Sequence, residues 1–193
     1  MLWGYQRMNS AAIGRLRSFC DRALYDVQGL VSLREQNKIS QVSIGMMADG
    51  LPGYGYDNRS DAIIRLLREV PVGSFDSALL AGGWNLLNQE GLAVFLEAEQ
   101  RGVEVHNAAI FGGGLLAGGV TYLYSTDRVT DELRQRTDAW SELAAEHGLS
   151  LPAVAVAFAA LPACVTKVVI GLSTITHARM HARAHAHTTL RHI

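Results

Sequence analysis

Apolar residues recur along the chain at two spacings, which predict helices and strands in alternation. Repeats of three and four residues are typical of a helix with one buried face, and they occupy the ranges 15–36, 60–69, 89–101, 131–147 and 150–161. Short runs of β-branched and other apolar residues are typical of buried strands, and they occupy the ranges 39–47, 75–81, 103–109 and 165–170. A last helix is expected to begin near Ser173 or Thr174. Strands that alternate with helices predict parallel βα units, and therefore an α/β fold.

Residues at the expected ends of the helices support these boundaries. Ser60 and Thr130 can each accept hydrogen bonds from the amides of a first helical turn. Pro71 cannot continue the helix before it, and Gly102 and Gly148 suit the position that follows a helix. Local chemistry therefore predicts where several helices begin and end.

The segment 103–119, VEVHNAAIFGGGLLAGG, is the most distinctive stretch of the chain. It joins an expected strand to three consecutive glycines and then to a second pair of glycines. Loops at the carboxyl ends of parallel strands are where ligands bind in α/β folds. Glycine runs also occur in turns that bind nothing. The two interpretations, a loop whose backbone a ligand approaches and a simple turn, both stay open.

Composition narrows the class of protein. The chain has 193 residues, of which 49% are hydrophobic and 18% charged, and this is enough to bury one core. A net charge of -1 gives no reason to expect nucleic acid or an anionic membrane as a partner. Cys20 and Cys164 form no C-x-x-C motif. The apolar run 149–165 contains two prolines and is shorter than the ~20 residues of a membrane span. We therefore expect a cytoplasmic protein.

Four segments resemble, in order and spacing, the second half of the aldo/keto reductases. They are 38–47, KISQVSIGMM; 75–92, FDSALLAGGWNLLNQEGL; 101–119, RGVEVHNAAIFGGGLLAGG; and 168–180, VVIGLSTITHARM. The likeness is greatest to the sugar-oxidising branch of that family, the L-galactose, L-fucose and D-threo-aldose 1-dehydrogenases. It extends over most of the chain.

The resemblance implies a partial TIM (β/α)8 barrel that consists of about the last four βα units. This barrel part is expected at residues 15–176, between an unassigned segment 1–14 and a tail 177–193 rich in His, Arg and Ala. A whole barrel has eight strands and typically about 250 residues. The family's catalytic aspartate, tyrosine, lysine and histidine all precede the part that matches. No catalytic residue is therefore assigned, and the fragment is expected to be inactive by itself.

The lysines agree with this expectation. The chain has two, Lys38 and Lys167, and both are expected at the starts of strands. The starts of the strands lie at the end of a barrel opposite the active site. Neither lysine is therefore expected to lower the pKa of a catalytic tyrosine.

The resemblance also implies a bound NAD or NADP. The positions that match the family's cofactor contacts are Trp84, Asn107, Phe111, Gly112, Gly113, Gly114, Leu115, Gly171, Ser173 and Thr174. The three glycines would let a pyrophosphate approach the backbone, and Ser173 and Thr174 would hold a phosphate at a helix start. Trp84 has two interpretations: it stacks on a cofactor ring, or it packs in the core.

Some positions depart from the family pattern and weaken the expected binding. Met47 replaces an asparagine that contacts the nicotinamide, and Ile110 replaces a proline. Met180 and His181 replace contacts to the adenosine. The choice between NAD and NADP stays open.

Two functions follow as hypotheses. The first is an oxidoreductase of the NAD(P)-dependent aldose dehydrogenase type, with a sugar or other carbonyl compound as substrate. The second is a non-catalytic half-barrel that binds a nucleotide or a partner chain, with open sheet edges that favour self-association. The histidines of the tail share one helix face at 177, 181 and 185, but no carboxylate or cysteine nearby completes a metal site. No metal is predicted.

Overall fold

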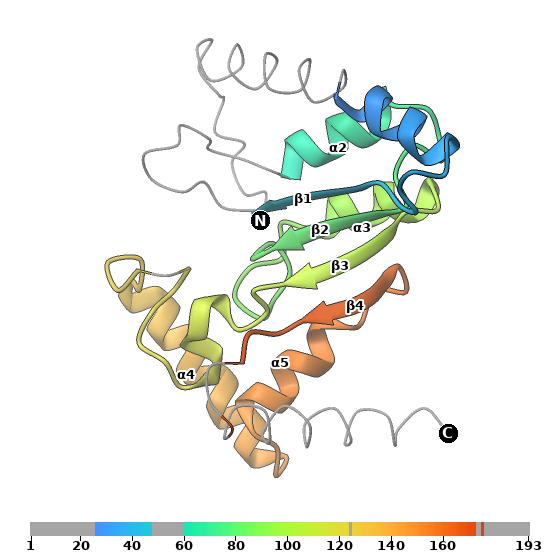
Figure 1. The fold of residues 1–193 in the computed structure, drawn as a ribbon. Coiled ribbons are helices and arrows are strands. Elements are labelled where there is room, and N and C mark those ends of the chain that lie inside the picture. Colours follow the sequence, from blue (N-terminus) through green and yellow to red (C-terminus); the bar gives the residue numbers. More distant parts are fainter. Residues whose placement is uncertain (1–25, 48–59, 124, 173–174, 176–193) are drawn as a thin grey trace.

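The strands form one parallel sheet in the order in which they occur along the chain. The computed structural model describes residues 26–47, 60–123, 125–172 and 175. Its sheet has the order β1-β2-β3-β4, and each strand is parallel to its neighbours. The strands are β1 (Ser43–Met47), β2 (Ser77–Ala81), β3 (Glu104–Ala108) and β4 (Val165–Val169). Figure 1 shows them side by side. The predicted α/β fold with parallel strands is confirmed.

Helices connect each strand to the next. Residues 26–35 are helical and precede β1. The connections then contain α2 (Ser60–Glu69), α3 (Leu92–Gln100), a 3₁₀ helix η1 (Gly112–Ala117), α4 (Asp131–Glu146) and α5 (Leu151–Ala159). A crossover through a helix is the usual way to join parallel neighbours.

The ends of the helices lie close to where local chemistry predicts them. The prediction for α2 is confirmed, since it begins at Ser60 and ends at Glu69, before Pro71. The side chain of Thr130 accepts a hydrogen bond of 3.2 Å from the amide of Leu133 in the first turn of α4. Gly148 follows the C-cap residue of α4, as expected.

Several predicted boundaries are wrong by a few residues. The strand expected from residue 39 begins at Ser43 instead. The Asp76 carboxylate accepts a 2.6 Å hydrogen bond from the Val42 amide, so this amide is bound by a side chain rather than by a strand. The helix expected from residue 89 begins at Leu92. Lys167 is the third residue of β4 rather than its first, so the expectation that both lysines start strands is also wrong.

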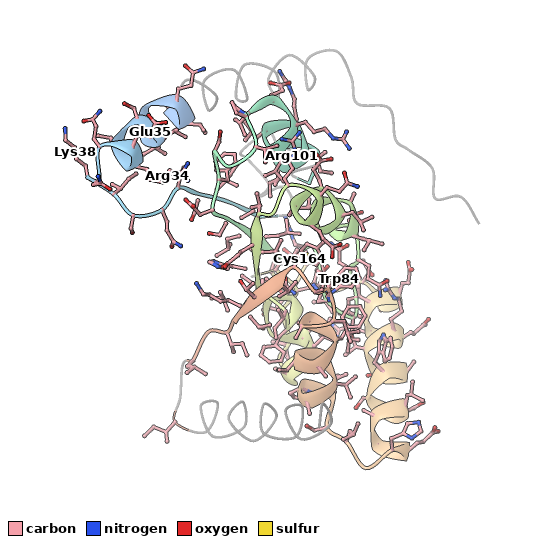
Figure 2. The ribbon with its side chains drawn as sticks, turned by 90° about the vertical axis from the view of Figure 1, so that its right-hand side faces the viewer. Arg34, Glu35, Lys38, Trp84, Arg101 and Cys164 are labelled. Atoms are coloured by element: carbon pink, nitrogen blue, oxygen red, sulfur yellow. The ribbon has the colours of Figure 1, made fainter. Side chains whose placement is uncertain are left out.

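Helices pack against one face of the sheet. Side chains alternate between the two faces of a strand, and Val42, Leu80 and Val105 on the helical face are at most 1% exposed. They join one buried cluster with Leu66 of α2 and Phe95 of α3. Figure 2 shows α3 and α5 on the same side of β3 and β4.

The opposite face carries more polar and more exposed residues. We call it the open face and define it by the residues that alternate along the strands with Val42, Leu80 and Val105: Ser43, Gly45, Ser77, Leu79, Ala81, Glu104, His106, Ala108, Lys167 and Val169. Ser77 is buried, at 4% exposure. Ser43 and Ser77 form a hydrogen bond of 2.7 Å between their hydroxyl oxygens. Glu104, Lys167 and Val169 are exposed. Parallel sheets are usually covered on both faces, so this exposure is unusual.

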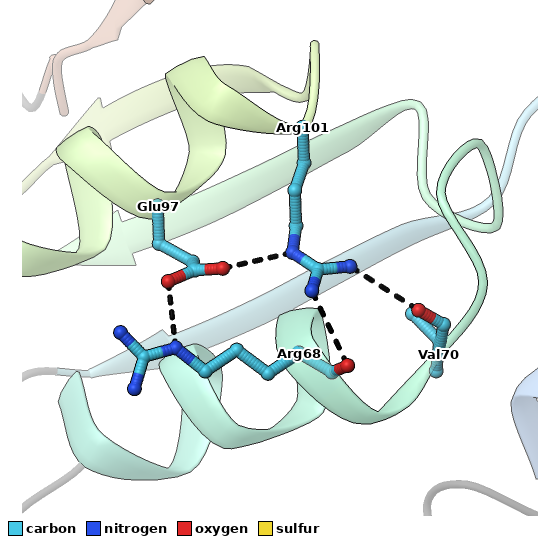
Figure 3. A network of polar contacts seen from close by, with 4 residues as sticks. All are labelled: Arg68, Val70, Glu97 and Arg101. Carbon is cyan, nitrogen blue, oxygen red and sulfur yellow. Dashed lines mark hydrogen bonds and ion pairs between the residues drawn. The ribbon is translucent and has the colours of Figure 1, made fainter.

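A shared carboxylate fixes α3 against α2. Glu97 of α3 accepts a hydrogen bond of 2.7 Å from Arg68 of α2 and one of 2.8 Å from Arg101 (Figure 3). Arg101 also donates to the carbonyl oxygens of Arg68 and Val70, both at 3.2 Å. The Glu97 side chain is only 9% exposed, whereas that of Arg68 is 64% exposed. Because solvent screens exposed charges, the Arg101 contact contributes more to stability than the Arg68 contact.

We expect Glu97→Gln to lower the free energy of unfolding by about 2 kcal/mol, because the buried negative charge is lost and one of its two acceptor oxygens becomes an NH2 group that faces an arginine donor. Hydrogen bonds from Arg101 and then Arg68 hold the pKa of Glu97 below its ordinary value of 4.5, against an opposing effect of burial. The stabilisation is therefore complete above the unfolded-state pKa and is lost as the pH falls through the lower folded-state pKa. Urea unfolding at several pH values measures this difference.

The matched control is Glu99→Gln, at an exposed position of the same helix. Its unfolding free energy should stay within about 0.5 kcal/mol of the parent protein. An equal loss in both variants, or a Glu97→Gln effect that is independent of pH, would contradict the assigned role.

Candidate functional site

The carboxyl ends of the strands lie in one row. Met47, Ala81, Ala108 and Val169 are paired in register across the sheet. Every loop that follows a strand therefore starts at the same edge, which we call the carboxyl edge. Ligands of parallel βα folds bind at this edge.

The loop 82–91 after β2 is organised around Asn85. This side chain is completely buried, and its Oδ1 accepts hydrogen bonds from the amides of Leu87 (2.9 Å) and Asn88 (3.0 Å). Its Nδ2 donates to the carbonyl oxygen of Gly82 at 3.2 Å. The loop then closes when the Gly91 amide donates to the Gly83 carbonyl oxygen at 2.7 Å. Asn85 thus replaces the strand and helix partners that this backbone lacks.

The glycine loop after β3 is a tight turn rather than an open loop. Its three consecutive glycines have φ values of 58°, 76° and 121°, which side chains rarely allow. A Cβ on Gly112 would lie 3.0 Å from the ring of Tyr122. Both the backbone conformation and the close contact therefore require glycine at this position.

The segment 119–123 holds all three glycine carbonyl groups. The carbonyl oxygen of Gly112 accepts a hydrogen bond from the Leu123 amide at 3.0 Å. That of Gly113 accepts one from the Thr121 hydroxyl at 2.8 Å, and that of Gly114 accepts one from the Gly119 amide at 2.9 Å. The chain itself therefore fixes the shape of the glycine loop.

This arrangement also sets the direction of two amides. The peptide bonds are trans, so each N–H points away from the C=O of the same peptide unit. The carbonyl groups of Gly112 and Gly114 point toward 119–123, so the amides of Gly113 and Leu115 point the other way. The amides of Gly112 and Gly114 are already bound, since they donate to the carbonyl oxygens of Ala109 at 3.0 Å and Phe111 at 3.1 Å, and the Leu115 amide lies within η1.

An apolar cluster joins the two loops. It contains Leu86 and Leu87 of the first loop and Leu115, Leu116, Tyr122 and Leu123 around the second, together with Val129 and Ala155. Arg136 of α4 donates a hydrogen bond of 2.9 Å to the carbonyl oxygen of Leu87. The loops are therefore held by packing from α4 and α5 as well as by their own hydrogen bonds.

Two of the predicted cofactor residues lie in the core below these loops. Trp84 is 8% exposed, and its ring stacks on Phe158 with centroids 5.0 Å apart. Its Nε1 donates to the Phe158 carbonyl oxygen at 3.3 Å. Asn107 is buried, and its Nδ2 donates to the carbonyl oxygens of Trp84 and Ala159, both at 3.1 Å. Both side chains connect the loops to α5.

The other predicted cofactor positions differ in burial, and some lie outside the described residues. Phe111 is half-buried beside the apolar cluster, and Gly171 is exposed after β4. Ser173 and Thr174 lie outside the described residues, and so does the histidine-rich tail with Met180. Of the predicted positions, the structure thus brings together those in the loop 82–91 and those in the glycine loop after β3.

Sequence reasoning missed Asn85 as the organiser of the first loop. The available signal was Asn85 and Asn88, two asparagines three residues apart between glycines. Asparagine is common at such positions because its side chain bonds to nearby backbone groups.

A cavity of about 250 Å³ lies away from these loops. It is lined by Val27 and Val31 of the first described helix and by Val70 and Pro71 after α2, among other residues. These segments lie at the amino end of the sheet, so the cavity is separate from the carboxyl edge.

Among the described residues, no group of three or more His, Cys, Asp or Glu side chains is placed to hold a metal ion. None of the described helices is long and apolar enough to cross a membrane.

Comparison with known proteins identifies the family. The family model described as "Aldo/keto reductase family" matches residues 64–191, well over half of the chain. The chain belongs to the aldo/keto reductase family. The coarser functional prediction, an oxidoreductase, is supported, and the parallel sheet is part of the family's TIM barrel.

One curated relative extends this result. A D-threo-aldose 1-dehydrogenase from a Pseudomonas species is 28% identical to this aldo/keto reductase chain over 146 residues. The alignment covers 74% of this chain and 40% of that protein. The chain therefore spans less than half the length of this relative.

We expect Asn85→Ala to loosen the first loop and to lower the unfolding free energy by about 2 kcal/mol, because buried backbone donors lose their acceptor. Limited proteolysis within 82–91 and thermal unfolding measure the two effects. Gln89→Ala, at an exposed position of the same loop, is the control and should behave like the parent. Unchanged proteolysis of Asn85→Ala would refute the organising role.

Proposed function

We propose that this chain carries the NAD(P)-binding part of an aldo/keto reductase that acts on an aldose or a related carbonyl compound. The observation that carries the proposal is the glycine loop at the carboxyl edge, with its carbonyl groups turned to 119–123 and the amide of Gly113 turned away from them. The aldose is suggested by the name of the relative, D-threo-aldose 1-dehydrogenase.

The shape of the glycine loop fits a pyrophosphate. Backbone N–H groups bind phosphate oxygens well where no side chain or carbonyl oxygen intervenes. The segment 109–123 contains no charged residue. An anionic group at this loop would therefore be held by backbone donors, such as the amide of Gly113, rather than by a cationic side chain.

The predicted site residues that the structure describes divide into three roles in this proposal. Gly112, Gly113 and Gly114 would contact the cofactor directly, and Gly171 would lie beside it at the end of the next strand. Trp84 and Asn107 would act as positioning residues, because Nε1 of Trp84 and Nδ2 of Asn107 donate to backbone carbonyl oxygens of the core. The Oδ1 of Asn107 is buried and has no hydrogen-bond partner among the described residues. Phe111 and Leu115 would shape the loop around the contact.

NAD(P), when bound, would accept or supply the hydride of the redox reaction. The family's aspartate, tyrosine, lysine and histidine would have to come from the part of the barrel that this chain does not match. We therefore propose that the chain binds cofactor by itself and needs further residues for turnover. A cytoplasmic location belongs to the same proposal, since the described thiol, Cys164, is not in a disulfide.

A second candidate is a half-barrel that binds a partner chain. The exposed Glu104, Lys167 and Val169 on the open face favour it. This function does not exclude the first.

Titration of the purified chain with NADPH and NADH, followed by cofactor fluorescence, tests cofactor binding directly. We expect saturable binding with a dissociation constant in the micromolar range, about -8 kcal/mol. A folded chain that binds neither nucleotide would refute the proposal.

Gly114→Ala tests the role of the glycine loop. Gly114 has a φ of 121°, but a Cβ there would meet nothing closer than 3.6 Å, so the substitution strains the backbone without a steric clash. We expect about ten-fold weaker NADPH binding, because a strained loop would move its amides. Gly148→Ala is the matched control, since Gly148 has a φ of 67° and open space at the end of α4. Equal affinity in both variants would argue against contact at the loop.

A further inference from the structure

Two residues beside the glycine loop have a backbone conformation that their side chains disfavour. Leu123 has a φ of 45° and Ala109 a φ of 54°, which lie in the left-handed region that glycine accepts and other residues rarely adopt. Among the described residues, Asn37 is the other non-glycine residue with a positive φ, and asparagine tolerates this region well. Strained backbone persists only where surrounding contacts hold it, and it is common at ligand sites.

Leu123 contacts both loops of the candidate site. Its amide donates to the Gly112 carbonyl oxygen at 3.0 Å, and its side chain, only 2% exposed, belongs to the apolar cluster between the loops. A Cβ on Gly82 would lie 3.0 Å from Cδ2 of Leu123, so this side chain also packs on the start of the first loop. The carbonyl oxygen of Gly82 in turn accepts hydrogen bonds from the side chains of Asn85 and Asn88.

The direction of the Gly113 amide depends on Leu123. The Gly112 carbonyl group and the Gly113 N–H belong to one trans peptide unit, so they point in opposite directions. The hydrogen bond from Leu123 to this carbonyl group therefore also sets where the N–H points. The amides of Gly112 and Gly114 are already bound within the loop, so the Gly113 amide is the one that an anion would use.

The left-handed conformation of Leu123 allows both of its contacts at once. The φ angle is the rotation about the bond between N and Cα, so it sets where the side chain lies relative to the amide. A change of φ to its ordinary negative range would move one relative to the other. The packing on Gly82 and the hydrogen bond to Gly112 would then not both persist.

We propose that Leu123 is a positioning residue of the candidate site, which holds the Gly113 amide in the direction that a pyrophosphate requires. The inference rests on the proposed function and adds to it the residue that sets the geometry of the binding loop. Because the same side chain packs on Gly82, the loop 82–91 and the glycine loop adopt this geometry together.

Two substitutions of similar volume separate the backbone conformation from packing. Leu123→Ile and Leu123→Met both keep an apolar side chain of about the same size. Isoleucine is branched at Cβ and strongly disfavours a positive φ, whereas methionine is unbranched and flexible. Leu66→Ile is the control for a changed core, since Leu66 is buried in α2 and belongs to the cluster under the sheet.

The first measurement needs no ligand. Hydrogen exchange followed by NMR reports how often the hydrogen bond between residue 123 and Gly112 opens. We expect the amide of residue 123 to exchange at least about ten-fold faster in Leu123→Ile than in the parent protein or Leu123→Met, because the strained backbone relaxes. Equal exchange in Leu123→Ile and the parent would overturn the inference, whether or not the chain binds a nucleotide.

Titration with ADP, which contains a pyrophosphate, measures the consequence for binding. The NMR signal of the Gly113 amide should shift saturably with ADP in the parent. We expect Leu123→Ile to bind ADP about ten-fold more weakly, and Leu123→Met and Leu66→Ile to stay within about two-fold of the parent.

The outcomes separate this inference from the proposed function. A parent chain that binds neither ADP nor NADPH would refute the proposed function and this inference with it. A parent that binds ADP with the same affinity as Leu123→Ile would overturn the inference alone. An equal loss of affinity in Leu66→Ile would also overturn it, because that loss reflects a weakened core rather than positioning.

A second variant covers the case in which Leu123→Ile does not fold, which circular dichroism detects. Leu123→Gly accepts a positive φ without strain, but it lacks the side chain that packs on Gly82. We expect the same weakening of ADP binding, about ten-fold, because nothing then fixes the amide of residue 123 toward Gly112. Binding of ADP by folded Leu123→Gly as tightly as by the parent would overturn the inference.

Discussion

Parallel pairing in register is the constraint on which the other features depend. It aligns Met47, Ala81, Ala108 and Val169 at one edge, and it requires a helical crossover between successive strands. Those crossovers place α2, α3 and α5 against one face of the sheet. The loops of the candidate site and the burial of one face of the sheet are thus two results of the same pairing.

Sequence reasoning succeeded where structure depends on near neighbours. The cap at Thr130 and the end of α2 before Pro71 involve interactions within a few residues. The start of β1 was missed because the Val42 amide is bound by Asp76, which is distant in sequence. No local pattern around residue 42 indicates that contact. The position of Lys167 within β4 depends in the same way on pairing with β3.

At the candidate site, too, features that depend on near neighbours in sequence were predicted, and contacts between more distant residues were not. The glycine run was placed correctly after a strand, because glycines and a β-branched run are visible in sequence. Its closure by Thr121 and Leu123 was not, since only the folded loop brings those groups to the glycine carbonyls. For Trp84 two interpretations were open, and the structure places its ring against Phe158. Whether the loop binds NAD(P) stays a prediction.

The contacts of Arg101 couple the folding of two helices. The last carbonyl groups of a helix lack intrahelical donors, and Arg101, which follows α3, donates to those of Arg68 and Val70 at the end of α2. Neither helix can therefore complete its polar contacts while the other is unfolded. The segment from α2 through β2 to α3 is expected to open and close as one cooperative unit. In a nascent chain, this unit would become stable only after Arg101 has left the ribosome.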